Sequence, residues 1–307
     1  MRLVVMIEPQ FGASYADQAR LAKHAEELGF DGFFRSDHLA TMRPDLGLPG
    51  PTDTWAVLAG LAVETSRLRL GAMVTSATFR LPGPLAVTVA TVDHMSDGRI
   101  EFGLGAGWFE PEHTAYGIPF PPVAERFDRL EEQLAIITGL WRTPVGERFD
   151  FAGLHYQLAD SPALPKPAQS PAPPVIVGGH GKKRTPELAV RYADEFNVPF
   201  SDVETSAALF RNVESVAAEL GRTTGGRAPL ALSAAQTVAC GRTDAEARNR
   251  AENIGGTPPL FGTPARIVDH IGRFADAGAS RLYLQILDLA DLDHLDVIAS
   301  QVAPQLH

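Results

Sequence analysis

An α/β barrel of eight parallel strands is the fold class that this sequence predicts. Segments typical of strands and of helices alternate along the chain, and eight strands are expected. The length of 307 residues is one at which such barrels form a single domain. A doubly wound open sheet is the structural alternative, but that fold usually has fewer strands. We therefore expect one (β/α)8 domain over residues 1–307.

Each expected strand is a short apolar run. In chain order, the strands are expected at residues 3–7, 32–35, 68–74, 100–104, 175–178, 196–200, 232–239 and 281–287. The expected helices have apolar residues on one face, a proline near the start or a glycine after the end. They cover residues 14–28, 54–64, 84–95, 123–141, 186–193 and 292–302, with one more between the sixth and seventh strands.

One segment, from about residue 142 to residue 174, interrupts this alternation. It contains seven prolines and two short extended pieces, around residues 148–151 and 154–158, that flank Ala152-Gly153. We expect a hairpin and a proline-rich stretch, inserted between the fourth helix and the fifth strand. Insertions over the mouth of a barrel follow strands, whereas this one follows a helix.

Composition and charge limit the classes of partner. The net charge of −10 argues against nucleic acid and against an anionic membrane, because both require a basic face. Cys240 is the single cysteine, so no internal disulfide forms and a reducing compartment is expected. Glu8 interrupts the N-terminal apolar run too early for a signal peptide, and no run is long enough to span a bilayer. We expect a cytoplasmic homodimer that acts on a small molecule.

The turn after the fifth strand has the composition of an anion site. Gly178-Gly179-His180-Gly181 is followed by Lys182 and Lys183, two of only four lysines in the chain. A helix is expected to start at Thr185-Pro186, and its free N–H groups would favour an anion. A tight turn with solvated lysines is the alternative. The residues at the ends of the other strands favour the interpretation of this turn as a phosphate site over that alternative.

Those strand ends matter because active sites of such barrels lie at the C-terminal face, called the mouth below. The second strand is followed by Asp37-His38, and a histidine there can carry a proton. The third ends in the small residues Gly71-Ala72, which suit a flat ring. The fourth ends in Gly103–Gly107, which we interpret as clearance for a ligand.

Other chemistries find no support. The glycines near residue 105 lack the spacing of a dinucleotide fingerprint, and Phe109-Glu110-Pro111 does not predict an immediate helix. No cluster has metal-ligand spacing, and no nucleophile elbow is present. A phosphate site, a flat wall and one histidine without a metal indicate a flavin-like cofactor.

The chain resembles the bacterial luciferase-like family of flavin- and deazaflavin-dependent oxidoreductases along its whole length. Within that family it most resembles the actinobacterial subgroup assigned to the deazaflavin coenzyme F420. No single piece is specific, but their order and spacing are. The matching pieces are Arg35–Leu39, Arg69–Gly71, Thr78–Arg80, Met95–Arg99, Gly103–Trp108, Pro119–Pro122, Glu125–Phe127, Gly178–Gly181 and Tyr283–Leu287.

The resemblance implies roles for particular residues. It implies a cis peptide between Met73 and Val74 that pushes against the cofactor ring. It implies that His38 is catalytic, as a proton donor or a stabiliser of developing charge. If His38 is not the proton carrier, Glu110 and His113 are the next candidates. The residues implied in cofactor binding are Asp37, Gly71, Ala72, Met73, Val74, Gly105, Gly107, Gly178, Gly179, His180, Gly181 and Lys182.

Two departures from the family pattern bear on the substrate. Sugar-phosphate dehydrogenases of the family have a glutamate where this chain has Trp108, and a tryptophan where it has Met42. A more apolar substrate than glucose 6-phosphate fits Trp108, Met42 and Phe109. We expect an oxidoreductase that uses F420 or FMN. A monooxygenase that uses reduced FMN and O2, and a barrel that binds a phosphorylated ligand without catalysis, are the alternatives.

Overall fold

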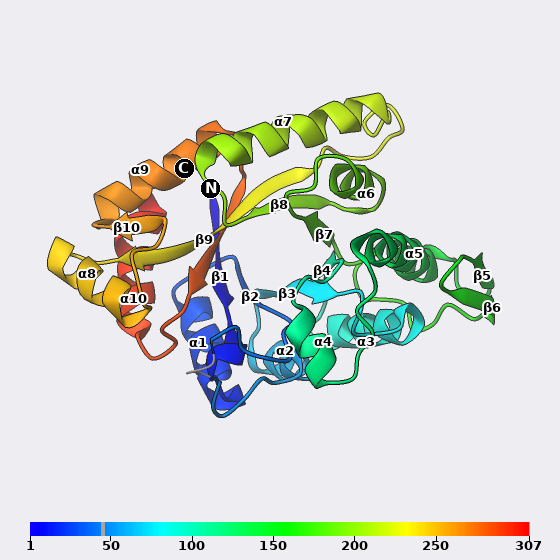
Figure 1. Cartoon of the computed structure of the whole chain (residues 1–307), viewed down its shortest axis with the longest axis horizontal. Helices are drawn as coiled ribbons and strands as arrows, with labels where there is room; N and C mark the ends of the chain where they lie inside the picture. Colours follow the sequence, from blue (N-terminus) through cyan, green and yellow to red (C-terminus); the bar gives the residue numbers. More distant parts are fainter. Residues whose placement is uncertain (44–46, 307) are drawn as a thin grey trace.

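In a computed structural model that describes residues 1–43 and 47–306, the chain forms a closed barrel surrounded by helices (Figure 1). All neighbouring strands of the barrel are parallel, and β8 pairs with β9 to close it. The fold and the position of the insertion were therefore predicted correctly. The barrel strands are β1 (Arg2–Ile7), β2 (Gly32–Arg35), β3 (Arg69–Ser76), β4 (Ile100–Gly105), β7 (Val175–Gly178), β8 (Glu195–Pro199), β9 (Ala231–Cys240) and β11 (Arg281–Ile286).

The longer helices follow the strands and cover the outside of the barrel. Apart from the end of the last helix, their bounds agree with the expected ones to within two residues where a helix was expected. They are α1 (Tyr15–Glu27), α2 (Thr54–Glu64), α3 (Pro82–Met95), α5 (Val123–Arg142), α6 (Arg184–Tyr192), α7 (Val203–Glu219), α8 (Asp244–Asn253), α9 (Pro264–Asp276) and α10 (Leu292–Val297).

Four local predictions were wrong or incomplete. A short helix, α4 (Glu110–Ala115), begins soon after β4, because Pro111 is well placed in a first helical turn. Helix α6 begins at Arg184, with Lys183 as its N-cap, so Thr185 and Pro186 lie inside its first turn. Helices α8 and α9 and a short strand, β10 (Leu260–Gly262), were not foreseen. The last helix ends at Val297 and continues as a π-helical turn.

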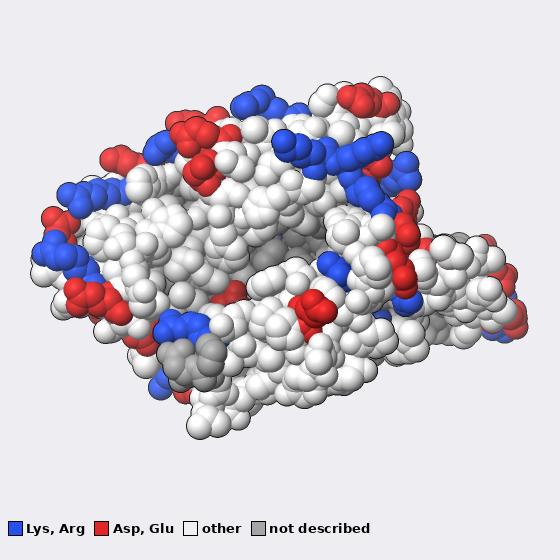
Figure 2. Space-filling model, in the orientation of Figure 1, with Lys and Arg blue, Asp and Glu red and all other residues white. Residues whose placement is uncertain are grey.

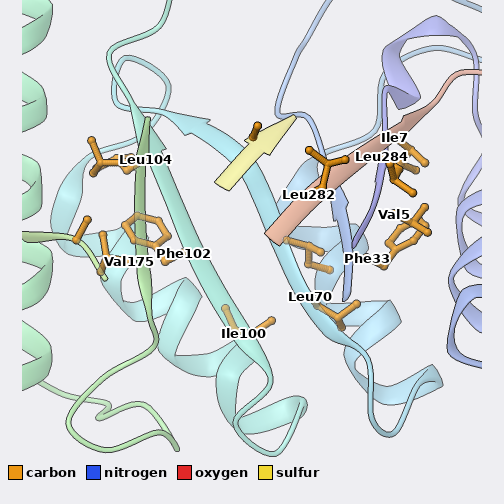
Figure 3. Packing of buried hydrophobic residues seen from close by; sticks show 14 of the residues in the cluster. Val5, Ile7, Phe33, Leu70, Ile100, Phe102, Leu104, Val175, Leu282 and Leu284 are labelled. Carbon is orange, nitrogen blue, oxygen red and sulfur yellow. The ribbon is translucent and has the colours of Figure 1, made fainter. Parts of the chain in front are cut away.

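The core forms two layers because alternate residues of each strand face opposite sides. Outward-facing residues such as Val5, Phe33 and Leu284 are fully buried beneath the helices (Figure 3). Inward-facing residues, among them Met6 and Tyr283, fill the barrel interior. Burial on both faces explains why the strands read as continuous apolar runs.

An ionic network occupies the end of the barrel opposite the mouth. The guanidinium of Arg281 contacts Glu101 (2.5 Å) and Glu195 (2.8 Å), and the Tyr283 hydroxyl donates to Glu195 (2.8 Å). Arg69 also contacts Glu101. Burial raises the pKa values of Glu195 and Tyr283, whereas Arg281 and Arg69 outweigh burial at Glu101 and lower its pKa. These groups lie near strand starts, where barrels place stability rather than catalysis.

The insertion lies beside the barrel. Its hairpin consists of β5 (Phe149–Ala152) and β6 (Gln157–Ser161), which pair antiparallel. The Gln169 amide donates to Asp93 and to the carbonyl of Ile100 at the start of β4, so the proline-rich stretch packs away from the mouth. This position agrees with an insertion that follows a helix.

Cys240 is fully buried in β9, and burial raises the pKa of its thiol to about 12. Among the helices of the described residues, none is long and apolar enough to cross a membrane.

Candidate active site

His38 lies at the end of β2 and is held by a buried carboxylate. Its Nδ1 is 3.0 Å from Oε1 of Glu112, which is 2% exposed and also accepts the N–H of Leu39 (2.8 Å). Because an ionised carboxylate only accepts, Nδ1 carries the proton. Nε2 has no partner among the described residues, so it is the nitrogen that is free to meet a ligand.

Two aromatic rings border the His38 imidazole. The rings of Trp108 and Phe109 meet it edge-on, with centroids 5.7 and 6.2 Å away. Trp108 follows the β4 glycines and remains 66% exposed. Met42 lies in the loop after His38, where its Sδ is 3.8 Å from the Gln10 amide nitrogen. One side of the imidazole therefore has an apolar wall.

Asp37 has a different set of contacts. Its carboxylate is buried and accepts both terminal nitrogens of Arg80, at 2.5 and 3.4 Å. Arg80 also contacts Asp53, the N-cap of α2. Burial lowers the pKa of Arg80, but the two aspartates outweigh it and raise that pKa overall. Through Arg80, the Asp37 side chain thus connects the segment after β2 with the start of α2.

The peptide between Met73 and Val74 is cis, as the resemblance implied. The pairing of β3 with β4 shifts at this point, between Ala72 and Thr75. Met73 packs against the inward-facing core residues. The bulge therefore lies at the mouth end of the barrel interior.

The glycines of β4 provide room for this bulge. A Cβ at Gly103 or Gly105 would come within 2.8 Å of the Val74 side chain, and one at Gly107 within 2.5 Å of Ser76 Oγ. The Val74 side chain thus occupies the space beside Gly103 and Gly105. Their contribution to the site is to allow the bulge.

Gly71 and Ala72 precede the bulge and are fully buried. A Cβ at Gly71 would lie 2.3 Å from the Phe34 ring. Packing inside the barrel is sufficient to explain a glycine at this position.

The loop after β7 forms a tight turn against β8. Gly179 has φ = +134°, a conformation that favours glycine, and a Cβ at Gly178 would lie 2.3 Å from the Asn197 carbonyl oxygen. His180 Nε2 is 2.8 Å from the Pro199 carbonyl oxygen and therefore carries a proton. Within the described residues, the N–H groups of Gly181, Lys182 and Lys183 meet no protein acceptor.

Cationic side chains surround this turn. Figure 2 shows Lys and Arg gathered beside α6, next to carboxylates of α5, and a hollow in the same face between α4 and strands β8 and β9. Arg184 pairs with Asp128 at 2.7 Å. Lys182 and Lys183 form no ion pair with the described residues. Free N–H groups and two uncompensated lysines are the features of an anion cradle.

The sequence reasoning missed Glu112, which orients His38. The two residues are 74 positions apart. The signal that could have identified Glu112 is its position shortly after the glycines that end at Gly107. It lies in α4, a segment that was not expected to be helical. His113, named instead, is fully buried and bonded to Thr78 Oγ1 (2.6 Å) and to the carbonyl of Phe109 (2.8 Å). Glu110 is exposed.

In the described part of the chain, no three or more His, Cys, Asp and Glu side chains converge in a way that could hold a metal ion.

The fold and the sequence together define the protein family of this chain. The closed parallel barrel defines the class of (β/α)8 proteins, and its histidine, bulged strand and free N–H groups lie at the mouth, where such barrels have their sites. The sequence model of the luciferase-like monooxygenase family matches residues 1–278, and the chain belongs to this family.

Individual proteins with known names are similar to this chain in sequence or in fold. The chain is 37% identical over 173 residues to an F420-dependent glucose-6-phosphate dehydrogenase of Microbacterium testaceum, which covers 56% of this chain and 49% of the relative. It is 38% identical over 188 residues to one of Nakamurella multipartita (61% and 52%). The match thus spans about half the length of each relative. An F420-dependent secondary alcohol dehydrogenase shares the fold, with a TM-score of 0.83, 19% identity and coverage of 100% and 99%.

Proposed function

We propose that this protein is an oxidoreductase that uses coenzyme F420, with FMN as the alternative cofactor, for hydride transfer to or from an organic substrate. The observation that carries the proposal is the arrangement of His38, the β3 bulge and the anion cradle around one mouth. The similarity to F420-dependent dehydrogenases supports the choice of F420. When bound, the cofactor ring supplies the hydride chemistry.

The residues present fit the phosphate of such a cofactor. The backbone N–H groups after Gly179 and the ammonium groups of Lys182 and Lys183 would hold it. His180 would stabilise the turn through its bond to the Pro199 carbonyl (2.8 Å). Gly178 and Gly181 allow close packing against Asn197 and Thr185, respectively.

The ring would lie on the β3 bulge. Met73 and Val74 would support its face, with Gly105 and Gly107 allowing the backbone to fold back behind them. Gly71 and Ala72 would lie beneath. Asp37 would act indirectly, because Arg80 occupies its carboxylate.

His38 would donate or hold a proton through Nε2 at the reacting atoms. Glu112 would act as a positioning residue that fixes the tautomer, since it accepts Nδ1–H. A barrel that only binds a ligand has no need of a histidine oriented in this way. The pair therefore favours an enzyme over the non-catalytic alternative.

The wall beside His38 favours an organic substrate other than glucose 6-phosphate. Trp108 stands where the sugar-phosphate dehydrogenases have a glutamate, and Phe109 extends the same surface. A substrate with an apolar part would bury that part against these rings. The lone, buried Cys240 is consistent with a cytoplasmic location.

The cofactor assignment is tested by binding. The purified protein should retain F420 on gel filtration, and a Gly179→Val variant should bind it at least tenfold more weakly, which is about 1.4 kcal/mol. Valine is strained at φ = +134° and would distort the cradle. Fluorescence titration with F420, and separately with FMN, measures the affinities.

Gly146→Val is the matched control, because Gly146 also has a positive φ (+95°) and open space but lies before the hairpin. It should bind F420 as the unaltered protein does. A folded Gly179→Val variant with full affinity would remove the cradle from the proposal.

We also propose that the protein is a homodimer formed through α2 and α3. Val63 on α2 and Val87 and Met95 on α3 are exposed, at 65%, 44% and 41%. Helices α2 and α3 thus have apolar residues on their outer sides as well as on their inner sides. A helix of this kind is usually buried on both sides. Sedimentation equilibrium should give twice 33.0 kDa, and Val87→Arg should shift the protein toward the monomer. A monomeric unaltered protein would contradict this proposal.

A further inference from the structure

A chain of hydrogen bonds centred on Glu8 connects the neighbouring strands β9, β11, β1 and β2 toward the mouth end of the barrel. Glu8 follows β1, two residues after the inward-facing Met6. Its two carboxylate oxygens accept the side-chain amides of Gln285 (2.7 Å) and Gln10 (2.5 Å). Both glutamines are buried, at 8% and 1% exposure. The Glu8 carboxylate is therefore held in one place by partners from β11 and from the loop after β1.

The charge of Glu8 sets the direction of the whole chain. An ionised carboxylate only accepts hydrogen bonds, so both amide NH2 groups must face Glu8. The amide oxygens then face two hydroxyls that donate to them, Ser36 to Gln10 (2.6 Å) and Thr237 to Gln285 (2.5 Å). Each of the two glutamine side chains therefore donates to Glu8 and accepts from a hydroxyl.

Glu8 nevertheless keeps unused acceptor capacity. A carboxylate offers about four acceptor positions, and two are occupied. No cation among the described residues pairs with Glu8, whereas Asp17 nearby is engaged by Ser14 and Arg20. An acceptor that is fixed in orientation, charged and without a cation is suited to bind a donor group from a ligand.

A cavity lies beside this free side. It measures about 270 Å³, is partly open to solvent, and is bordered by the ends of β1 and β11 and the first turns of α1. Glu8 lines it together with the apolar side chains of Phe11, Leu287 and Leu289 and with three other charged residues, Asp17, Arg20 and Asp288. Arg20 pairs with Asp17 (3.4 Å) and not with Glu8. The cavity lies at the carboxyl ends of β1 and β11, the same end of the barrel as the loop after β2 that contains His38. Gln10 connects the two regions, because it bonds both Glu8 and Ser36.

We propose that Glu8 is a specificity-determining residue that accepts a hydrogen bond from an O–H or N–H group of the substrate, and that this cavity receives that end of the molecule. The inference rests on the proposed function, because it assumes that the substrate enters the mouth beside His38. The substrate would then combine an apolar part against Trp108 with a hydroxyl or ammonium group at Glu8.

The test uses three probes of equal size that differ in one group: 4-hydroxybutan-2-one, 4-aminobutan-2-one hydrochloride and pentan-2-one. Each is titrated into the ¹⁵N-labelled protein without cofactor, and backbone amide shifts are followed. The hydroxyl or the ammonium probe should shift the amides of Gly12 and Ala290, which line the cavity, and bind at least tenfold more tightly than pentan-2-one. Preference for one of the two identifies the donor.

Glu8→Gln should abolish this preference, and the exposed Glu27→Gln should leave it intact. Because Glu8→Gln disturbs the hydrogen-bond chain, Ala290→Trp provides a second variant that fills the cavity from an exposed position and should weaken all three probes. Equal affinity for the three probes, or a preference that survives in Glu8→Gln, would overturn the inference. The cofactor is absent from this experiment, so its failure would leave the proposals for His38 and Gly179 standing.

Discussion

Replacing His38 with alanine should lower turnover by about 10²–10⁴-fold, the usual contribution of a positioned general acid or base. The imidazole is oriented by Glu112 at 3.0 Å and presents Nε2 to the mouth. Cofactor affinity should fall far less, because the cradle after β7 supplies much of the binding. Steady-state kinetics with a panel of ketones, enones and aldehydes and reduced F420 or FMN measures the effect.

Two variants separate catalysis from structure. Glu112→Gln keeps the size of the side chain but removes the charge that fixes the His38 tautomer, so it should lower kcat and shift the pH profile while sparing cofactor affinity. His24→Ala, which removes a histidine contacting Asp296 on the surface, should have no effect on turnover. Full turnover in His38→Ala would transfer the proton-carrying role to Glu110, since His113 is buried with both ring nitrogens bonded.

Replacing Arg281 with methionine should lower the free energy of unfolding by about 3–5 kcal/mol, the typical cost of removing one partner of a buried ion pair. The substitution would leave Glu101 and Glu195 together in the barrel interior without the guanidinium that joins them. Chemical denaturation followed by circular dichroism measures the change.

Arg273→Met is the matched control, because Arg273 pairs with Glu204 at 2.9 Å while both side chains are more than half exposed. Its loss should cost at most about 1 kcal/mol. Adding Glu195→Gln to Arg281→Met should recover part of the stability, because one buried charge is then removed. Equal losses for the two arginine variants would contradict the assignment of Arg281 as the centre of a buried network.

The fold could be predicted because each barrel strand is buried on both faces. Such strands are continuous apolar runs, as at Val175–Gly178, and they stand out between amphipathic helices such as Val123–Arg142. Helix α9 was missed although Pro264 opens its first turn and its buried apolar residues lie on one face. At two other places the local signals were weak. Helix α4 is only six residues long, and the start of α6 at Arg184 depends on how the glycine turn packs against β8.

Local composition was enough to indicate the barrel, the turn after β7 and a histidine at the end of β2, because each of these is encoded within a few consecutive residues. The partners of those residues come from distant parts of the chain: Glu112 is 74 positions from His38, and Arg281 is 180 positions from Glu101. Only closure of the barrel brings such residues together, since strand order and register decide which side chains share the interior. The clearance at Gly103 and Gly105 shows the same dependence, because the group that fills it, Val74, lies on the neighbouring strand.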